Sequence, residues 1–178
     1  MEKIRLKGMV FASLFAALTA AVAWFKIPLP FTPVPITLQT IVVLLSGAML
    51  GSYYGALSMI IYIMVGALGL PVFAGGASGI GVLIGPTGGY LFSYFIAAFV
   101  IGKIIESMKP SYANYVVAMI VGSIVIYSLG ATQGKLITKL PWNAIVVGWV
   151  LPFIIGDVIK LLLAAWIAKN IDAKKYMK

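Results

Sequence analysis

The sequence predicts an all-α integral membrane protein, a bundle of six transmembrane helices with both termini in the cytoplasm. Of its 178 residues, 62% are hydrophobic and only 10% are charged, whereas a soluble domain carries roughly 25% charged residues. A chain with so little polar surface needs the lipid bilayer as its solvent. Because a spanning helix takes about 20 residues, six spans with short loops use residues 1–178 as a single membrane domain.

The predicted spans are apolar runs at residues 8–25, 36–52, 53–70, 87–105, 113–130 and 143–168. The second and third runs nearly touch, and we divide them at Gly51–Gly55 because glycines suit a tight turn between antiparallel helices. The first run also has features of a signal peptide. Since all that follows it is equally apolar, we interpret it as a retained helix.

The basic residues predict the orientation of the bundle. With the N-terminus inside, nine of them lie on the cytoplasmic side and three in external loops, in agreement with the positive-inside rule. The nine are Lys3, Arg5, Lys7, Lys103, Lys109, Lys169, Lys174, Lys175 and Lys178, and the three are Lys26, Lys135 and Lys139. A net charge of +9 could also indicate a protein that binds nucleic acid. Because the basic residues lie at the ends of the apolar runs, membrane orientation explains the charge, and we expect no nucleic-acid partner.

The composition argues against an enzyme. The chain contains neither cysteine nor histidine, so thiol chemistry, the commonest general base and the commonest metal ligand are missing. The glycine-rich sequences lack the Gly-Lys-Ser/Thr ending of a phosphate loop, so we predict no ATP site in this chain. We expect no metal site and no cofactor.

Two segments between the runs have special backbones. Residues 26–35 hold four prolines, which exclude a helix and predict an extended, stiff external loop. Residues 69–89 are rich in glycine and carry no charge. Non-helical backbone this apolar is tolerated near membrane depth only where it is buried or lines a cavity. It is either a tight connector between helices or a lid whose amides meet a ligand.

Asp157 and Lys160 are the strongest functional signal. Both lie within the last apolar run, where a charge costs at least about 2.5–3.5 kcal/mol at mid-helix. Their i, i+3 spacing places them on one helical face, where they can pair. The pair is either purely structural or a ligand site, and we favour the ligand site because ionisable residues inside membranes are usually functional.

The first run carries a row of small residues at i, i+4 spacing: Ala12, Ala16 and Ala20. Such a row lets another helix approach closely. The neighbour is either a helix of this chain or a partner protein, and the pattern alone does not distinguish the two.

Four motifs resemble the BioY family, the biotin-binding substrate components (S components) of energy-coupling factor transporters. They are Pro33-Val-Pro-Ile-Thr-Leu-Gln-Thr, Gly69-Leu-Pro-Val-Phe-Ala-Gly-Gly, Gly85-Pro-Thr-Gly-Gly-Tyr and the Gly-Asp-Val-Ile-Lys of residues 156–160. The resemblance spans nearly the whole chain. It implies high-affinity biotin uptake in the cell membrane of a prokaryote, with a membrane coupling (T) subunit and two ATPase subunits as partners.

The resemblance also implies site residues. The ligand-binding set is Asp157, Lys160, Gln39, Gly75, Gly76, Gly88, Gly89 and Tyr90, and the row Ala12, Ala16 and Ala20 becomes the surface that docks on the coupling subunit. Biotin has an acidic tail, and we expect Lys160 to meet its carboxylate. Its ureido group needs donors and acceptors, which loop backbone, Asp157 or Gln39 can supply.

This chain departs from the family pattern at two positions. Ala77 stands where some members place a polar residue, and Leu91 where others place a basic one, so neither contact is expected here.

The main alternative function is a self-sufficient secondary transporter of a small anionic vitamin, with Asp157 as a proton or sodium site. Such carriers often show paired repeats, with a broken helix in each half of the chain, and we find neither in this sequence.

Overall fold

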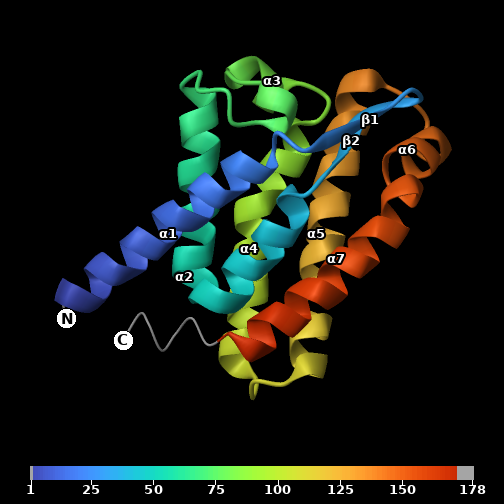
Figure 1. The fold of residues 1–178 in the computed structure, drawn as a ribbon. Coiled ribbons are helices and arrows are strands. Elements are labelled where there is room, and N and C mark those ends of the chain that lie inside the picture. Colours follow the sequence, from blue (N-terminus) through green and yellow to red (C-terminus); the bar gives the residue numbers. More distant parts are fainter. Residues whose placement is uncertain (1, 172–178) are drawn as a thin grey trace.

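The computed structural model describes residues 2–171, with side chains from residue 5 onward. Within this part, five helices are long and apolar enough to cross a membrane: α1 (Glu2–Val22), α2 (Gln39–Ala67), α4 (Gly88–Ser107), α5 (Tyr112–Thr138) and α7 (Leu151–Asn170). Figure 1 shows them as one bundle in which α2 packs against α1, α4 and α7. The predicted helical membrane architecture is thus present, but not as six separate helices.

Helix α2 reverses direction at Gly51. This residue has φ +80° and ψ −176°, a conformation essentially limited to glycine. A Cβ atom on Gly55 would lie 2.8 Å from the carbonyl oxygen of Ser46, an approach that a straight helix does not allow. The 29 residues of α2 therefore form two arms, 39–50 and 52–67 (Figure 1). The sequence analysis divided two apolar runs at Gly51–Gly55, which is where the helix bends.

The second arm of α2 has its own N-terminal cap. The backbone amide of Ser52 donates a 2.7 Å hydrogen bond to the carboxylate of Glu106 at the end of α4, and the Ser52 hydroxyl donates to the same carboxylate. A carboxylate at a helix start satisfies free amides and interacts favourably with the helix dipole. The bend is thereby fastened to α4.

Short elements gather at the opposite end of the bundle (Figure 1). The proline-rich loop is extended, as predicted, and forms an antiparallel hairpin of β1 (Lys26–Leu29) and β2 (Thr32–Thr37). Both strands are edges, where prolines are tolerated. The glycine-rich segment contains two short helical turns, η1 (Ala74–Gly76) and α3 (Ile80–Ile84).

Two predicted spans differ clearly from the observed helices. Helix α5 continues to Thr138 rather than residue 130, because Gln133 and Thr138 turn their polar groups onto nearby carbonyl oxygens. The last predicted run is two helices, α6 (Trp142–Trp149) and α7, separated at Val150. Pro152 lies in the first turn of α7, where a missing amide proton is harmless.

Helix α1 begins and α7 ends at the same end of the bundle, away from the hairpin (Figure 1). Many large apolar side chains on the outer faces of α1 and α7 are exposed, including Leu14 at 57% and Ile155 at 78%. Exposed apolar surface of this extent is expected where helices face lipid. Of the basic residues used to predict the orientation, Lys174, Lys175 and Lys178 and the side chain of Lys3 lie outside the described part.

Candidate ligand-binding site

A cavity of about 180 Å³ lies beneath the hairpin, at the end of the bundle where the short elements gather. Its walls come from the hairpin, the start of α2, the glycine-rich segment and helices α4, α5 and α7. It is mostly apolar, and only three charged side chains line it, namely Lys26, Asp157 and Lys160. Concave apolar sites with a few convergent polar groups are typical of small-molecule binding.

The ammonium group of Lys160 is held by three acceptors. Its Nζ lies 2.5 Å from Oδ1 of Asp157, 2.8 Å from the carbonyl oxygen of Thr37 and 3.1 Å from the hydroxyl of Thr40. A protonated lysine has three N–H donors, so these partners match its capacity. The two charged side chains are only 14% and 18% exposed, which places the predicted pair inside the protein.

Asp157 is held from other elements as well. Its Oδ2 accepts a hydrogen bond from the hydroxyl of Tyr127 on α5, and its Oδ1 also accepts a long one from Thr40 on α2. The carboxylate therefore has a fixed orientation that three helices determine. A buried charge that is paired and hydrogen-bonded in this way avoids most of the desolvation penalty of an isolated charge.

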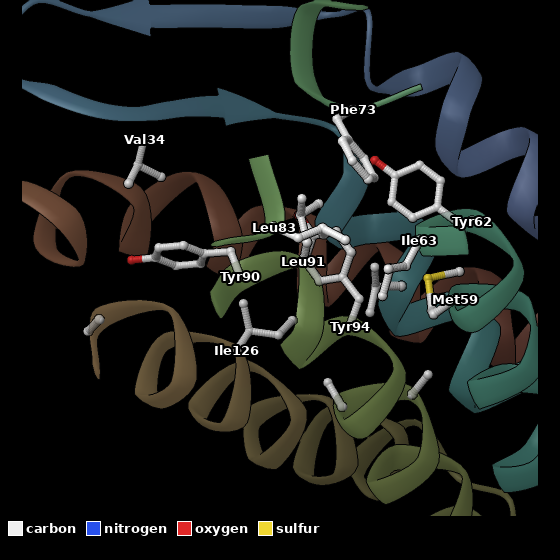
Figure 2. Packing of buried hydrophobic residues seen from close by; sticks show 14 of the residues in the cluster. Val34, Met59, Tyr62, Ile63, Phe73, Leu83, Tyr90, Leu91, Tyr94 and Ile126 are labelled. Carbon is white, nitrogen blue, oxygen red and sulfur yellow. The ribbon is translucent and has the colours of Figure 1, made fainter. Parts of the chain in front are cut away.

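Gln39 joins the cavity to an aromatic cluster. It is only 2% exposed, lines the cavity, and donates through Nε2 to the hydroxyl of Tyr62, which in turn donates to the carbonyl oxygen of Val72. Figure 2 shows the Tyr62 ring beside Phe73 and close to Tyr94. The ring centroids lie 5.6 Å apart for Tyr62 and Phe73 and 6.5 Å apart for Tyr62 and Tyr94.

Tyr90 and Tyr94 form part of the wall. They are four residues apart on α4, so they share one helical face, and both line the cavity with Phe73 and Phe153. The hydroxyl of Tyr90 donates to the backbone carbonyl of Trp149, 2.7 Å away at the end of α6. This bond fixes the Tyr90 ring, whose position among the buried residues is visible in Figure 2.

Of the predicted ligand-binding residues, the structure brings Asp157, Lys160, Gln39 and Tyr90 to the cavity. The four predicted glycines are not among the residues that line it. A Cβ atom on Gly88 would lie 1.7 Å from the carbonyl oxygen of Leu83, and one on Gly89 would lie 2.4 Å from that of Leu129. These two glycines permit close packing of α4, so their ligand-binding role stays a prediction.

Gly75 and Gly76 also pack within the chain. Both have positive φ, at 68° and 80°, a region that glycine enters without strain. The amide of Gly75 donates to the carbonyl oxygen of Ala23, and the backbone of Gly76 lies against the Trp24 ring. Their neighbours Ala74 and Ala77 line the cavity in their place.

Two alanines of the predicted docking row, Ala12 and Ala16, are buried within this chain. Ala12 and Ala16 are 0% and 5% exposed, and Ala20 packs partly buried against the same core cluster as Ala16. Small side chains let α1 approach α2 closely, and the Tyr54 ring of α2 lies directly on Gly8. The row thus packs between two helices of this chain, and its docking on a coupling subunit stays a prediction.

Sequence reasoning missed most of the residues that line the cavity, among them the polar residues Lys26, Thr37, Thr40 and Tyr127. Thr37 and Thr40 belong to the proline-rich motif and flank Gln39, so a signal for them was present. Tyr127 stands alone in an apolar run, where nothing marks it from other tyrosines. The sequence analysis used Lys26 only as one of the basic residues that predict the orientation of the bundle in the membrane.

The fold and the site define a class: a multi-pass helical membrane protein with a mostly apolar cavity and a charge pair inside it. The sequence profile of the BioY family matches residues 1–176. The chain belongs to the BioY family.

Similar proteins agree with this membership. The chain is 45% identical over 163 residues to the "Biotin transporter BioY" of Thermotoga maritima, covering 92% of this chain and 94% of that one. It is 38% identical over 177 residues to the protein of the same name in Rhodobacter capsulatus, covering 93% of each. These relatives are transporters rather than enzymes, as predicted.

A solved structure has the same fold. It is the crystal structure of the "S-component for biotin from an ECF-type ABC transporter", with a TM-score of 0.86 and 27% sequence identity. The match covers 93% of this chain and 90% of that one.

Proposed function

We propose that this chain binds biotin in the cavity and serves as the substrate-binding S component of an energy-coupling factor transporter for biotin uptake. The names of the similar proteins support the ligand. The observation that carries the proposal is the Asp157–Lys160 pair, held in fixed geometry inside a mostly apolar cavity. A paired charge maintained at membrane depth is expected to have a function.

The chemistry of the pair suits the ureido group of biotin. A cyclic urea presents N–H donors beside a carbonyl acceptor, whereas Asp157 and Lys160 present an acceptor beside a donor on one face of α7. The urea carbonyl can take the place of one of the acceptors of Lys160, and a urea N–H can donate to Asp157. The aromatic wall formed by Tyr94, Phe73 and Phe153 suits the apolar parts of the bicyclic ring.

Energy for uptake comes, in this proposal, from other subunits. The chain has no phosphate-loop motif, and the similar solved structure comes from an ECF-type ABC transporter. We therefore propose a membrane coupling (T) subunit and two ATPase subunits as partners, in the cell membrane of a prokaryote. With each arm of α2 counted as a span, the chain is a single six-helix domain with both termini cytoplasmic.

Calorimetric titration of the detergent-solubilised chain with biotin tests the ligand assignment. We expect saturable binding, without ATP or partners, at micromolar biotin or below, which corresponds to about −8 kcal/mol or a more favourable value. Absence of saturable binding at micromolar concentration refutes the assignment.

Uptake into proteoliposomes tests the coupling. The proposal expects biotin uptake to require the coupling and ATPase subunits together with ATP. Uptake by the chain alone, driven by a proton or sodium gradient, would instead establish the secondary transporter. In that case Asp157 becomes the first candidate for the ion site.

A further inference from the structure

Lys26 is the third charged residue of the cavity, and it does not belong to the Asp157–Lys160 pair. It is the first residue of β1 and lines the cavity from the side of the hairpin. Its side chain makes no hydrogen bond or ion pair with any residue between 5 and 171. Since it is also exposed, its ammonium group keeps its donors available for a ligand.

The Lys26 side chain has a defined place. It lies across Gly75, where an added Cβ atom would come within 2.4 Å of both Cδ and Nζ of Lys26. A residue with a side chain at position 75 would push the ammonium group away. Gly75, which was predicted to contact the ligand, thus leaves room for a cation.

Lys160 is poorly placed to meet a second anion. All three of its N–H donors have partners within the chain, and Asp157 already balances its charge. A neutral carbonyl can replace one of these partners, but a ligand carboxylate at Lys160 would lie close to the like-charged Asp157 carboxylate. The tail of an acidic ligand is therefore favoured at Lys26, where no carboxylate stands beside the cation.

The hairpin fixes both cations at one cavity. Pairing of β1 with β2 sets Lys26 opposite Thr37, and the carbonyl of Thr37 is the oxygen that holds Lys160. Ala77 and Leu91 line the same cavity but have no side-chain donor to offer. No other cation of the described residues borders it.

We propose that Lys26 is the specificity-determining residue for the acidic tail of the ligand, while Asp157 and Lys160 take its polar ring. This inference rests on the proposed function, because the acidic tail is that of biotin. It replaces our sequence-based expectation that Lys160 meets the carboxylate. The site then recognises the two ends of the ligand with separate groups, one on the hairpin and one on α7.

The test compares biotin with biotin amide, whose tail is uncharged, on four proteins: the parent, Lys26→Met, Lys26→Arg and the control Lys139→Met. Lys139 is an exposed basic residue that does not line the cavity. We expect Lys26→Met to weaken biotin binding about tenfold, the scale of one charge-assisted hydrogen bond. Its affinity for the amide should stay at the parental value.

Lys26→Arg should retain most of the parental preference for biotin, and Lys139→Met should retain all of it. Melting temperatures of all four proteins report folding, and the unchanged amide affinity shows that the cavity is intact. If the parent binds biotin and Lys26→Met keeps the full preference for biotin over the amide, this inference is overturned while the proposed function stands. If the parent binds neither compound, the proposed function itself fails.

Discussion

The hydroxyl of Tyr127 donates a 2.5 Å hydrogen bond to Oδ2 of Asp157, joining α5 to α7. Because Oδ1 of the same carboxylate accepts from Lys160 and Thr40, the donors of three helices together determine how Asp157 is oriented. A ligand that bonds to this carboxylate meets a group already fixed in place, which reduces the ordering cost of binding.

The first prediction concerns Tyr127→Phe, which removes this one donor and keeps the ring. We expect biotin affinity to fall about tenfold, and stability to fall by about 1.5–3 kcal/mol as a hydrogen bond to a charged group is lost. Tyr112→Phe is the matched control, since Tyr112 lies on the same helix but away from the cavity. Parental affinity in Tyr127→Phe, measured by titration, would show that this bond does not matter to the site.

The second prediction separates a ligand site from a structural pair. Asp157→Asn and Lys160→Met each leave an uncompensated group, and each should lose about 3 kcal/mol of stability, the lower end of the range for broken buried pairs. A separate double variant that is apolar at both positions, Asp157→Leu with Lys160→Met, should recover stability but not biotin binding. A stable double variant that binds biotin like the parent would make the pair purely structural.

The third prediction tests the direction of the alanine row. Ala16 is buried against α2, whereas its neighbour Ala17 is exposed. Ala16→Trp should therefore overpack the interface and cost at least about 1–3 kcal/mol, with lower expression and a lower melting temperature. Ala17→Trp should melt like the parent. Equal melting temperatures for the two variants would place the row outside the bundle after all.

The fourth prediction concerns the bend in α2. Gly51→Ala forces a side chain into a backbone conformation with φ +80° and sets its Cβ atom 2.6 Å from the carboxylate of Glu106. The strain of such a residue is about 1–3 kcal/mol, and the melting temperature should fall accordingly. Gly156→Ala on α7 is the control, because an added Cβ atom there meets nothing within 4 Å. A Gly51→Ala protein as stable as Gly156→Ala would contradict this account of the bend.

Features that depend on local spacing were predictable from the sequence. Asp157 and Lys160 are three residues apart on one helix, so their pairing follows from helix geometry alone. The break at Gly51 follows from the conformational freedom of glycine. The prolines of residues 26–35 predicted extended backbone, although not the pairing of β1 with β2, since a hairpin depends on both strands at once.

Features that depend on which elements meet were not predictable. Tyr127 reaches Asp157 across 30 positions of sequence, and no pattern in α5 marks this tyrosine. The row containing Ala12 and Ala16 showed that some helix approaches closely, but a row of small residues does not say which one. The contact of the Lys26 side chain with Gly75 depends on how the hairpin meets the glycine-rich segment, and no pattern in either segment predicts it.

The reversal of α2 at Gly51 has an effect on the far side of the molecule. Gln39 and Tyr62 are 23 positions apart, and in a straight helix they would stand about 35 Å from each other. Folding back brings them into hydrogen-bond contact at the cavity, about 18 Å of helix away from the bend. The bend therefore decides, from the far end of α2, which residues of its two arms stand side by side at the cavity.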